Sequence, residues 1–340
     1  MPSRMLEEAL EAPAAVARQL EAGDAPIAEL AARWRSTPPE RLFTVARGSS
    51  DHAAHFTAYL LMGRLGATVT SLPPSLVTLE HAPLPRAGSA VLAFSQSGRS
   101  PDLVEAIEWF SQADAETVAF VNDIASPLAA SASTVVGLHA GDERSVAATK
   151  SFIAQLAAGA RLVAAWQENV SFNDALRLLP ESLATASRAD WSSAVEVLSR
   201  AQRLLVIGRG TGLAIAQEAA LKLKEVADLH AEAFSGAEVL HGPQALVHDG
   251  QPVLLFAPRG NTHAGLVRLA ETLVQRGARV LLAAPAGTPG GSLPIATARD
   301  PALDGLCAIQ SFYPLAEAVA RARGLDPDRP RHLAKVTLTH

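Results

Sequence analysis

Hydroxyl and amide side chains gather in two short stretches of the first half of the chain. In LAFSQSGRSPDLVEA, residues 92 to 106, an apolar run ends in polar residues before a helical pattern resumes. ARGSSDH, residues 46 to 52, follows another apolar run in the same way. At the start of a helix, hydroxyls add to the backbone N–H groups that bind an anion. We expect a phosphate cradle made of Ser49, Ser50, Ser95, Gln96, Ser97 and Ser100. The alternative is that these residues only cap helices and form turns.

Acid and base groups are concentrated in the second half, in QEAALKLKEVADLHAEAF, residues 217 to 234. Glu218, Lys222 and Glu225 stand at i, i+4 and i+7, so one face of a helix carries all three. The flanking Ala and Leu residues predict a largely buried helix, in which these groups would have altered pKa values. The alternative is a solvated stripe of surface ion pairs. His241 precedes Gly242-Pro243 in a loop, where a histidine often has no catalytic role.

An internal repeat indicates which elements position these residues. RLFTVARGSS at 41 aligns with RLLVIGRGTG at 203, AVLAFSQSG at 90 with PVLLFAPRG at 252, and ETVAFV at 116 with ARVLLA at 278, all at an offset of 162 residues. Short apolar runs alternate with helical patterns in each copy, which is typical of βαβ units. We therefore predict an α/β fold with two copies of one domain, each a flavodoxin-like, doubly wound parallel sheet with helices on both faces.

The repeat also predicts the organisation of the chain. Residues 1–35 are expected to form amphipathic helices packed outside the first copy, which spans residues 36–170. A polar linker, residues 171–193, contains Pro180 as a break. The second copy then spans residues 194–325, and residues 326–340 form a C-terminal tail.

The two copies differ where the cradle is expected. In doubly wound sheets, ligands bind beyond the carboxyl ends of the strands, where loops enter helices. Moved by the offset, Ser95, Gln96 and Ser97 become Ala257, Pro258 and Arg259. The second copy has lost most of these donors, so we expect one phosphate cradle, in the first copy.

Composition limits the partners and the compartment. With 340 residues, 49% of them hydrophobic, and a net charge of -5, the chain has no general basic field for nucleic acid or an anionic membrane. A single cysteine, Cys307, excludes an internal disulfide framework and a cysteine-cluster metal site, which suits the cytoplasm. We expect no signal peptide and no membrane span.

Six ordered motifs carry a resemblance to a known family. SQSG, ATKSF, EAALKLKE, HAEAF, HGP and DRPRHLAK together resemble the isomerase half of glutamine-fructose-6-phosphate aminotransferase, which is built from two sugar-isomerase (SIS) domains. The chain is also similar to stand-alone SIS-type glucosamine-6-phosphate deaminases. A glutaminase of the aminotransferase type needs an N-terminal cysteine, whereas this chain begins Met1-Pro2, so we expect no glutaminase domain.

The resemblance implies roles for individual residues. Sugar phosphate would bind the cradle, and Glu225 would move a proton between C1 and C2, assisted by Lys222. His241 would open the sugar ring and would reach the site of the other subunit in a homodimer. Lys335 in the tail would meet the carbonyl carbon. Val146 and Ala148 would line the sugar site, although the family commonly has ASTK where this chain has AATK, so that Ala148 replaces a serine.

The resulting hypothesis is deamination with isomerisation, in which glucosamine 6-phosphate gives fructose 6-phosphate and ammonia. This chemistry requires no metal and no redox cofactor. Three alternatives stay open within the family: cleavage of a fructosamine 6-phosphate, aldose-ketose isomerisation, and a synthase fed by a separate glutaminase subunit. A further alternative is a non-catalytic sugar-phosphate sensor, which would need the cradle but not Glu225, His241 and Lys335.

Overall fold

A computed structural model describes residues 2–23 and 25–335 of the chain, which form two compact units. The first-copy unit contains residues 14–143 and 150–177 and, of the tail, Ala334 and Lys335. The second-copy unit contains residues 2–13, 144–149 and 178–333. Each unit is built around one parallel sheet.

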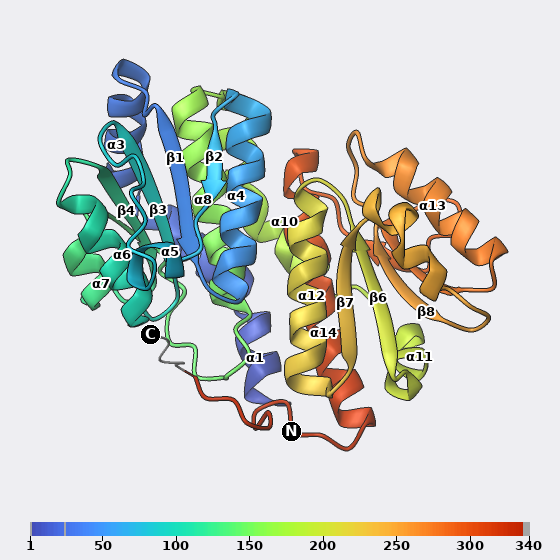
Figure 1. The fold of residues 1–340 in the computed structure, drawn as a ribbon. Coiled ribbons are helices and arrows are strands. Elements are labelled where there is room, and N and C mark those ends of the chain that lie inside the picture. The colour runs from blue at the N-terminus through green and yellow to red at the C-terminus, as the bar shows by residue number, and fades with distance from the viewer. Residues whose placement is uncertain (1, 24, 336–340) are drawn as a thin grey trace. The chain divides into compact units, whose positions relative to one another are not determined.

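The first-copy unit has five parallel strands in the order β2-β1-β3-β4-β5. The strands are β1 (Arg41–Ala46), β2 (Val69–Ser71), β3 (Ser89–Ser95), β4 (Glu116–Val121) and β5 (Thr134–Gly137). The helices are α2 (Ala12–Glu21), which begins in the second-copy unit, α3 (Ala25–Ser36), α4 (Ser49–Leu65), α5 (Ser75–Thr78), α6 (Pro101–Ser111), α7 (Pro127–Ser131), α8 (Lys150–Gln167) and α9 (Val170–Arg177). In Figure 1, α4 and α8 cover one face of this sheet, and α6 and α7 cover the other.

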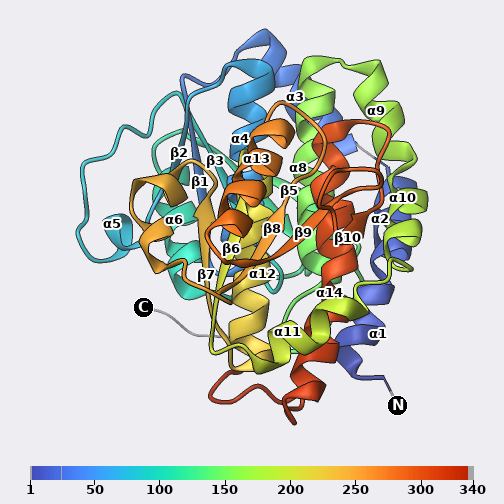
Figure 2. The same ribbon diagram turned by 90° about the vertical axis from the view of Figure 1, so that its right-hand side faces the viewer.

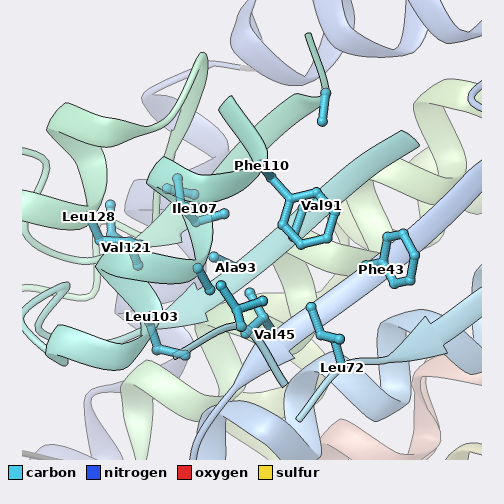
Figure 3. Packing of buried hydrophobic residues seen from close by; sticks show 14 of the residues in the cluster. Phe43, Val45, Leu72, Val91, Ala93, Leu103, Ile107, Phe110, Val121 and Leu128 are labelled. Carbon is cyan, nitrogen blue, oxygen red and sulfur yellow. The ribbon is translucent and has the colours of Figure 1, made fainter. Parts of the chain in front are cut away.

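Alternation along the strands explains the core on the α6 side of the sheet. Phe43 and Val45 of β1 face the same way as Val91 and Ala93 of β3, because side chains two apart in a strand share a face. They pack against α6 residues spaced three or four apart, as Figure 3 shows. The α6 residues in this core are Leu103, Ala106, Ile107 and Phe110.

The second-copy unit repeats this topology, with the strand order β10-β9-β8-β6-β7 visible in Figure 2. Its strands are β6 (Arg203–Gly208), β7 (His230–Ser235), β8 (Pro252–Phe256), β9 (Arg279–Pro285) and β10 (Leu293–Ile295). Its α-helices are α1 (Arg4–Leu10), α10 (Leu179–Ala186), α11 (Val195–Arg200), α12 (Thr211–Ala227), α13 (His263–Gln275) and α14 (Asp304–Ala322). Short 3₁₀ helices are η1 (Ser192–Ala194), η2 (Glu238–His241), η3 (Pro243–Leu246) and η4 (Pro301–Leu303). In Figure 1, α12 lies on one face of this sheet and α13 on the other, and α14 packs against α12.

The two sheets confirm the predicted α/β fold with two doubly wound copies. In both, the first strand of the copy lies between its second and third strands, which is the flavodoxin-like order. The expected constant offset is wrong at the fourth strand. Val91 pairs with Thr117, whereas the equivalent Val253 pairs with Val280, so the offset there is 163 residues. One extra residue between β8 and β9 shifts the alignment.

One expectation about the connecting segments needs correction, and another is confirmed. Residues 2–13 belong to the second-copy unit, because α1 buries Met5 and Ala9 and packs against α14. Only the remainder of the N-terminal helical segment lies with the first copy. The break expected at Pro180 is present, because α9 ends at Arg177 and α10 begins at Leu179. Pro180 stands in the first turn of α10, where a proline is tolerated because that N–H has no partner within the helix.

The helices of the structure can be compared with the expectation that the chain has no membrane-spanning segment. Within residues 2–23 and 25–335, no helix is both long and apolar enough to cross a lipid bilayer.

Candidate functional site

The hydroxyl-rich loops lie at the topological switch point of the first sheet. β1 and β3 are neighbours, but the chain leaves β1 towards β2 on one side and reaches β3 on the other. Ser49 opens α4 directly after β1, and residues 96–100 connect β3 to α6. Two helix N-termini therefore follow adjacent strands at the edge of the sheet where ligands bind in such folds.

Hydrogen bonds fix the shape of the loop after β3. The Ser95 hydroxyl oxygen accepts from the Gly98 N–H at 3.0 Å, and that of Ser97 accepts from the Arg99 N–H at 3.3 Å. Gly98 has a φ of +62°, and a Cβ there would lie 2.0 Å from the Ser126 hydroxyl oxygen, so only glycine fits. Because the two serines act as acceptors in these bonds, their O–H groups are available to donate to a ligand.

The second loop is tied to the first by charge. After β1, the Arg47 guanidinium lies 2.8 Å from the carboxylate of Asp102 in the first turn of α6. Asp102 is buried and Arg47 is half exposed, so the ion pair links the two loops at the switch point. Ser50 accepts a hydrogen bond from the side-chain amide of Gln155 at 2.9 Å. Ser100 precedes α6 at the capping position, but its side chain makes no capping hydrogen bond.

The second copy has replaced this cradle with an internal ion pair. At the position of Ser97 stands Arg259, whose guanidinium contacts both carboxylate oxygens of Asp304, at 2.7 and 2.8 Å. The hydrogen bond that Arg259 donates to Asp304 is the main reason that the pKa of Arg259 is raised. Because the positive charge of Arg259 is already paired with Asp304, this loop of the second copy does not require a bound anion. The structure is therefore consistent with a phosphate cradle in the first copy only.

Acid and base groups converge on one face of α12, as their spacing predicts. The ammonium of Lys222 lies 3.5 Å from a carboxylate oxygen of Glu218 and hydrogen bonds to the carboxylate of Glu225. Lys222 and Glu218 are 1% and 0% exposed at their side chains, but Glu225 is 19% exposed. The three residues form a buried triad rather than a solvated stripe, with Glu225 as the one member that reaches outwards.

A pocket of about 600 Å³ in the second-copy unit borders Glu225. One wall is the carboxyl-terminal part of α12, including Leu221 and Lys224, and the other is the chain after α14, from Gly324 to Leu333. An ionisable side chain that rests on a buried partner and borders a pocket is well placed for proton transfer.

The chain after α14 is held by contacts along its length. Arg323 donates to the carbonyls of Ser199 and Ala201 at 3.0 and 2.8 Å, and Arg331 lies 3.7 Å from the carboxylate of Asp228. In the first-copy unit, the Lys335 ammonium is 3.6 Å from the carboxylate of Glu143, whose side chain is fully buried. Lys335 is therefore paired with an acid and is not a freely solvated tail residue.

Three candidate residues lie elsewhere. His241 ends η2 and is exposed, and no hydrogen bond or ion pair joins it to Glu225 among the described residues. Val146 and Ala148 are half-buried in the segment 144–149 of the second-copy unit. This structure thus brings together Lys222 and Glu225 and orders the loops of the cradle, but it does not join His241 to either group.

Sequence reasoning missed two residues that support the site, Arg47 and Glu143. Arg47 stands immediately before the glycine and serines of its loop, which was a usable signal. Glu143 has no such signal, because its partner Lys335 is distant in the sequence. No cluster of His, Cys, Asp or Glu suited to a metal ion occurs in the part of the chain that the structure describes.

The triad generates a prediction about stability. Replacing Lys222 with Met leaves Glu218 and Glu225 close together without the buried cation. We expect Lys222→Met to lower the free energy of unfolding by about 3–5 kcal/mol, the usual cost of breaking a buried ion pair. Urea unfolding measures it, with Lys224→Met, on the exposed side of the same helix, as the control that changes it by about 0.5 kcal/mol or less. Equal unfolding midpoints for the two variants would contradict the role of the triad.

Comparisons with known proteins agree with this architecture. The SIS domain matches residues 37–165 and 197–286. The glutamine–fructose-6-phosphate aminotransferase (isomerizing) of Aeropyrum pernix is 34% identical over 357 residues, covering 98% of this chain and 57% of the relative. The chain thus spans little more than half the length of that relative.

Solved structures extend the comparison. The proposed phosphosugar isomerase of Silicibacter pomeroyi is 42% identical, with a TM-score of 0.90 over 96% of this chain and 100% of that one. Glucosamine-6-phosphate deaminase of Thermotoga maritima, at 22% identity and a TM-score of 0.79 over 99% of this chain and 100% of that one, shows the same fold. From the two matched ranges and their two sheets, the chain belongs to the SIS domain family.

Proposed function

We propose that the chain is a phosphosugar isomerase that deaminates glucosamine 6-phosphate, giving fructose 6-phosphate and ammonia. The observation that carries the proposal is the Glu225 carboxylate, which rests on a buried lysine and borders a pocket. The relatives add support, since one is named an isomerizing fructose-6-phosphate aminotransferase and a protein of the same fold is named a glucosamine-6-phosphate deaminase.

In the proposed reaction, the cradle holds the phosphate and Glu225 moves the proton. The carboxylate takes the proton from C2 of the open-chain amino sugar and returns it to C1. The enolamine thereby becomes an imine at C2, which water cleaves to the ketone and ammonia. The overall balance is glucosamine 6-phosphate plus water to fructose 6-phosphate plus ammonia.

The supporting groups have distinct tasks. Lys222 holds the Glu225 carboxylate in position through their hydrogen bond. Lys335 polarises the developing oxyanion or forms a Schiff base with the carbonyl carbon. His241 transfers protons at the ring oxygens during opening, since an imidazole can do so near neutral pH. These roles are assigned by motif, and the resemblance is their main support.

We propose a homodimer in which His241 serves the site of the other subunit. His241 is exposed, and the apolar side chains of Leu240 and Leu246 nearby are 48% and 50% exposed. A neighbouring copy that covers them would bury this apolar surface. We place the reaction in the cytoplasm, because a chain with one cysteine does not depend on disulfides.

A second candidate function is aldose-ketose isomerisation without loss of ammonia. It is favoured by the 42% identity to a proposed phosphosugar isomerase over that protein's full length. The same carboxylate would move the same proton in a sugar that carries a hydroxyl at C2. Ammonia release from glucosamine 6-phosphate separates the two candidates, and a sugar-phosphate sensor would catalyse neither reaction.

The cradle is tested with Ser97→Ala. Loss of a neutral hydroxyl donor should raise KM for glucosamine 6-phosphate about tenfold while changing kcat little, which corresponds to about 1–2 kcal/mol of binding. Steady-state assays of ammonia release measure both constants, with Ser193→Ala, an exposed serine in η1 of the second-copy unit, as the control. Unphosphorylated glucosamine should be a very poor substrate, and equal turnover of both sugars would rule out the phosphate assignment.

The proton shuttle is tested with Glu225→Gln. The amide keeps the shape of the side chain but cannot act as a base, so kcat should fall by about 10²-fold or more. The variant should stay folded and bind glucosamine 6-phosphate in calorimetry. Glu271→Gln, on the exposed side of α13, is the matched control. Near-normal turnover by the Glu225 variant would reduce the triad to a structural ion pair.

A further inference from the structure

Helix α1 lies outside both ranges that match the SIS domain, yet it contacts two parts of the candidate site. It spans Arg4–Leu10, whereas the first matched range begins at residue 37. It is fixed to α14 by the buried side chains of Met5 and Ala9 and by a hydrogen bond of 2.9 Å from the Gln310 amide to the Ala9 carbonyl. A helix that is held rigidly in this way can fix the position of the residues that it contacts.

The first contact joins Glu8 to the segment 144–149. Glu8 is 5% exposed, and its two carboxylate oxygens accept from the backbone N–H groups of Arg144 and Ser145, at 2.6 and 3.0 Å. Hydrogen bonds to a buried carboxylate are strong, and the Glu8 carboxylate accepts two of them from consecutive backbone amides. The backbone of residues 144 and 145 continues directly into Val146 and Ala148, the candidate sugar contacts.

The second contact lies at the opposite end of α1. The Asp328 carboxylate accepts from the backbone N–H groups of Arg4 and Met5, at 2.8 and 2.9 Å. These amides have no partner within the helix, and negative charge is favoured there. Asp328 belongs to the segment after α14 that forms one wall of the pocket at Glu225. One short helix thus connects the pocket wall to the segment 144–149.

We propose that α1 is a brace for the substrate site and that Glu8 is a positioning residue, acting through the backbone of residues 144 and 145. The brace rests on the hydrogen bonds of Glu8 and Asp328. Its effect on sugar binding rests on the proposed function of Val146 and Ala148. Loosening the brace should weaken the binding of sugar phosphate more than it slows the chemical step, because Glu225 stands on another helix.

Hydrogen exchange on Glu8→Gln tests the brace without any substrate. The glutamine amide offers one acceptor oxygen, and its NH₂ group cannot accept from a backbone N–H, so one of the two bonds is lost. Peptides covering residues 143–150 should exchange about tenfold faster or more. Glu7→Gln, exposed on the same helix, should leave the exchange unchanged. Unchanged exchange in the Glu8 variant would overturn the brace.

Turnover tests the consequence for the site. In Glu8→Gln, KM for glucosamine 6-phosphate should rise about tenfold while kcat stays within about twofold. Faster exchange with an unchanged KM would overturn the positioning role. If the wild-type protein releases no ammonia, the proposed reaction has failed. In that case the affinity of the wild type and of Glu8→Gln for glucosamine 6-phosphate is compared by calorimetry instead of KM.

Asp328→Asn is the second variant, and it keeps the test decisive if Glu8→Gln does not fold. Asp328 is only partly buried, and asparagine retains one acceptor, so the protein should stay folded. Exchange should rise at residues 4–8 and, through the helix, at residues 143–150, with a smaller rise in KM. Faster exchange confined to residues 4–8, with an unchanged KM, would overturn the link between the pocket wall and the segment.

Discussion

The buried ammonium of Lys222 is the constraint on which the candidate site depends. Removing such a charge from water costs several kcal/mol unless acids surround it. Glu218 and Glu225 supply that compensation from the same helix. The presence of two acids also matters for chemistry. When Glu225 takes up a proton, an ionised Glu218 still balances the lysine, so Glu225 can change its charge without leaving a buried cation alone.

In the proposed function, the two copies of the fold divide the chemistry. Both sheets have the same strand order, so both offer loops at the same edge. In the first copy these loops carry serines and a glycine that no larger residue can replace. In the second copy the position equivalent to Ser97 holds Arg259, which is paired with Asp304, and the proposed acid–base chemistry lies on the helix after β6. In this proposal, a duplicated scaffold has one anion site in one copy and one acid–base site in the other.

Local patterns were enough to predict the sheets, the cradle loops and the shared face of α12. Strand alternation and helix spacing are local, so Phe43 with Val45, or Lys222 with Glu225, can be placed from the sequence alone. The features that were predicted wrongly depend on contacts between residues that are distant in the sequence. The shift of one residue at β9 depends on pairing between strands. The position of α1 depends on Gln310 and Ala9, about 300 residues apart. Such contacts leave no periodic signal in the chain.

The central claim is that one fixed carboxylate delivers the proton to C1, and the most direct test is the stereochemistry of that delivery. Glucosamine 6-phosphate is converted in D₂O, and the two C1 hydrogens of the fructose 6-phosphate first formed are examined by NMR. A base held on one side of the substrate predicts that any deuterium enters only one of the two C1 positions. Deuterium shared equally between both positions would mean protonation from either face, and would contradict the account.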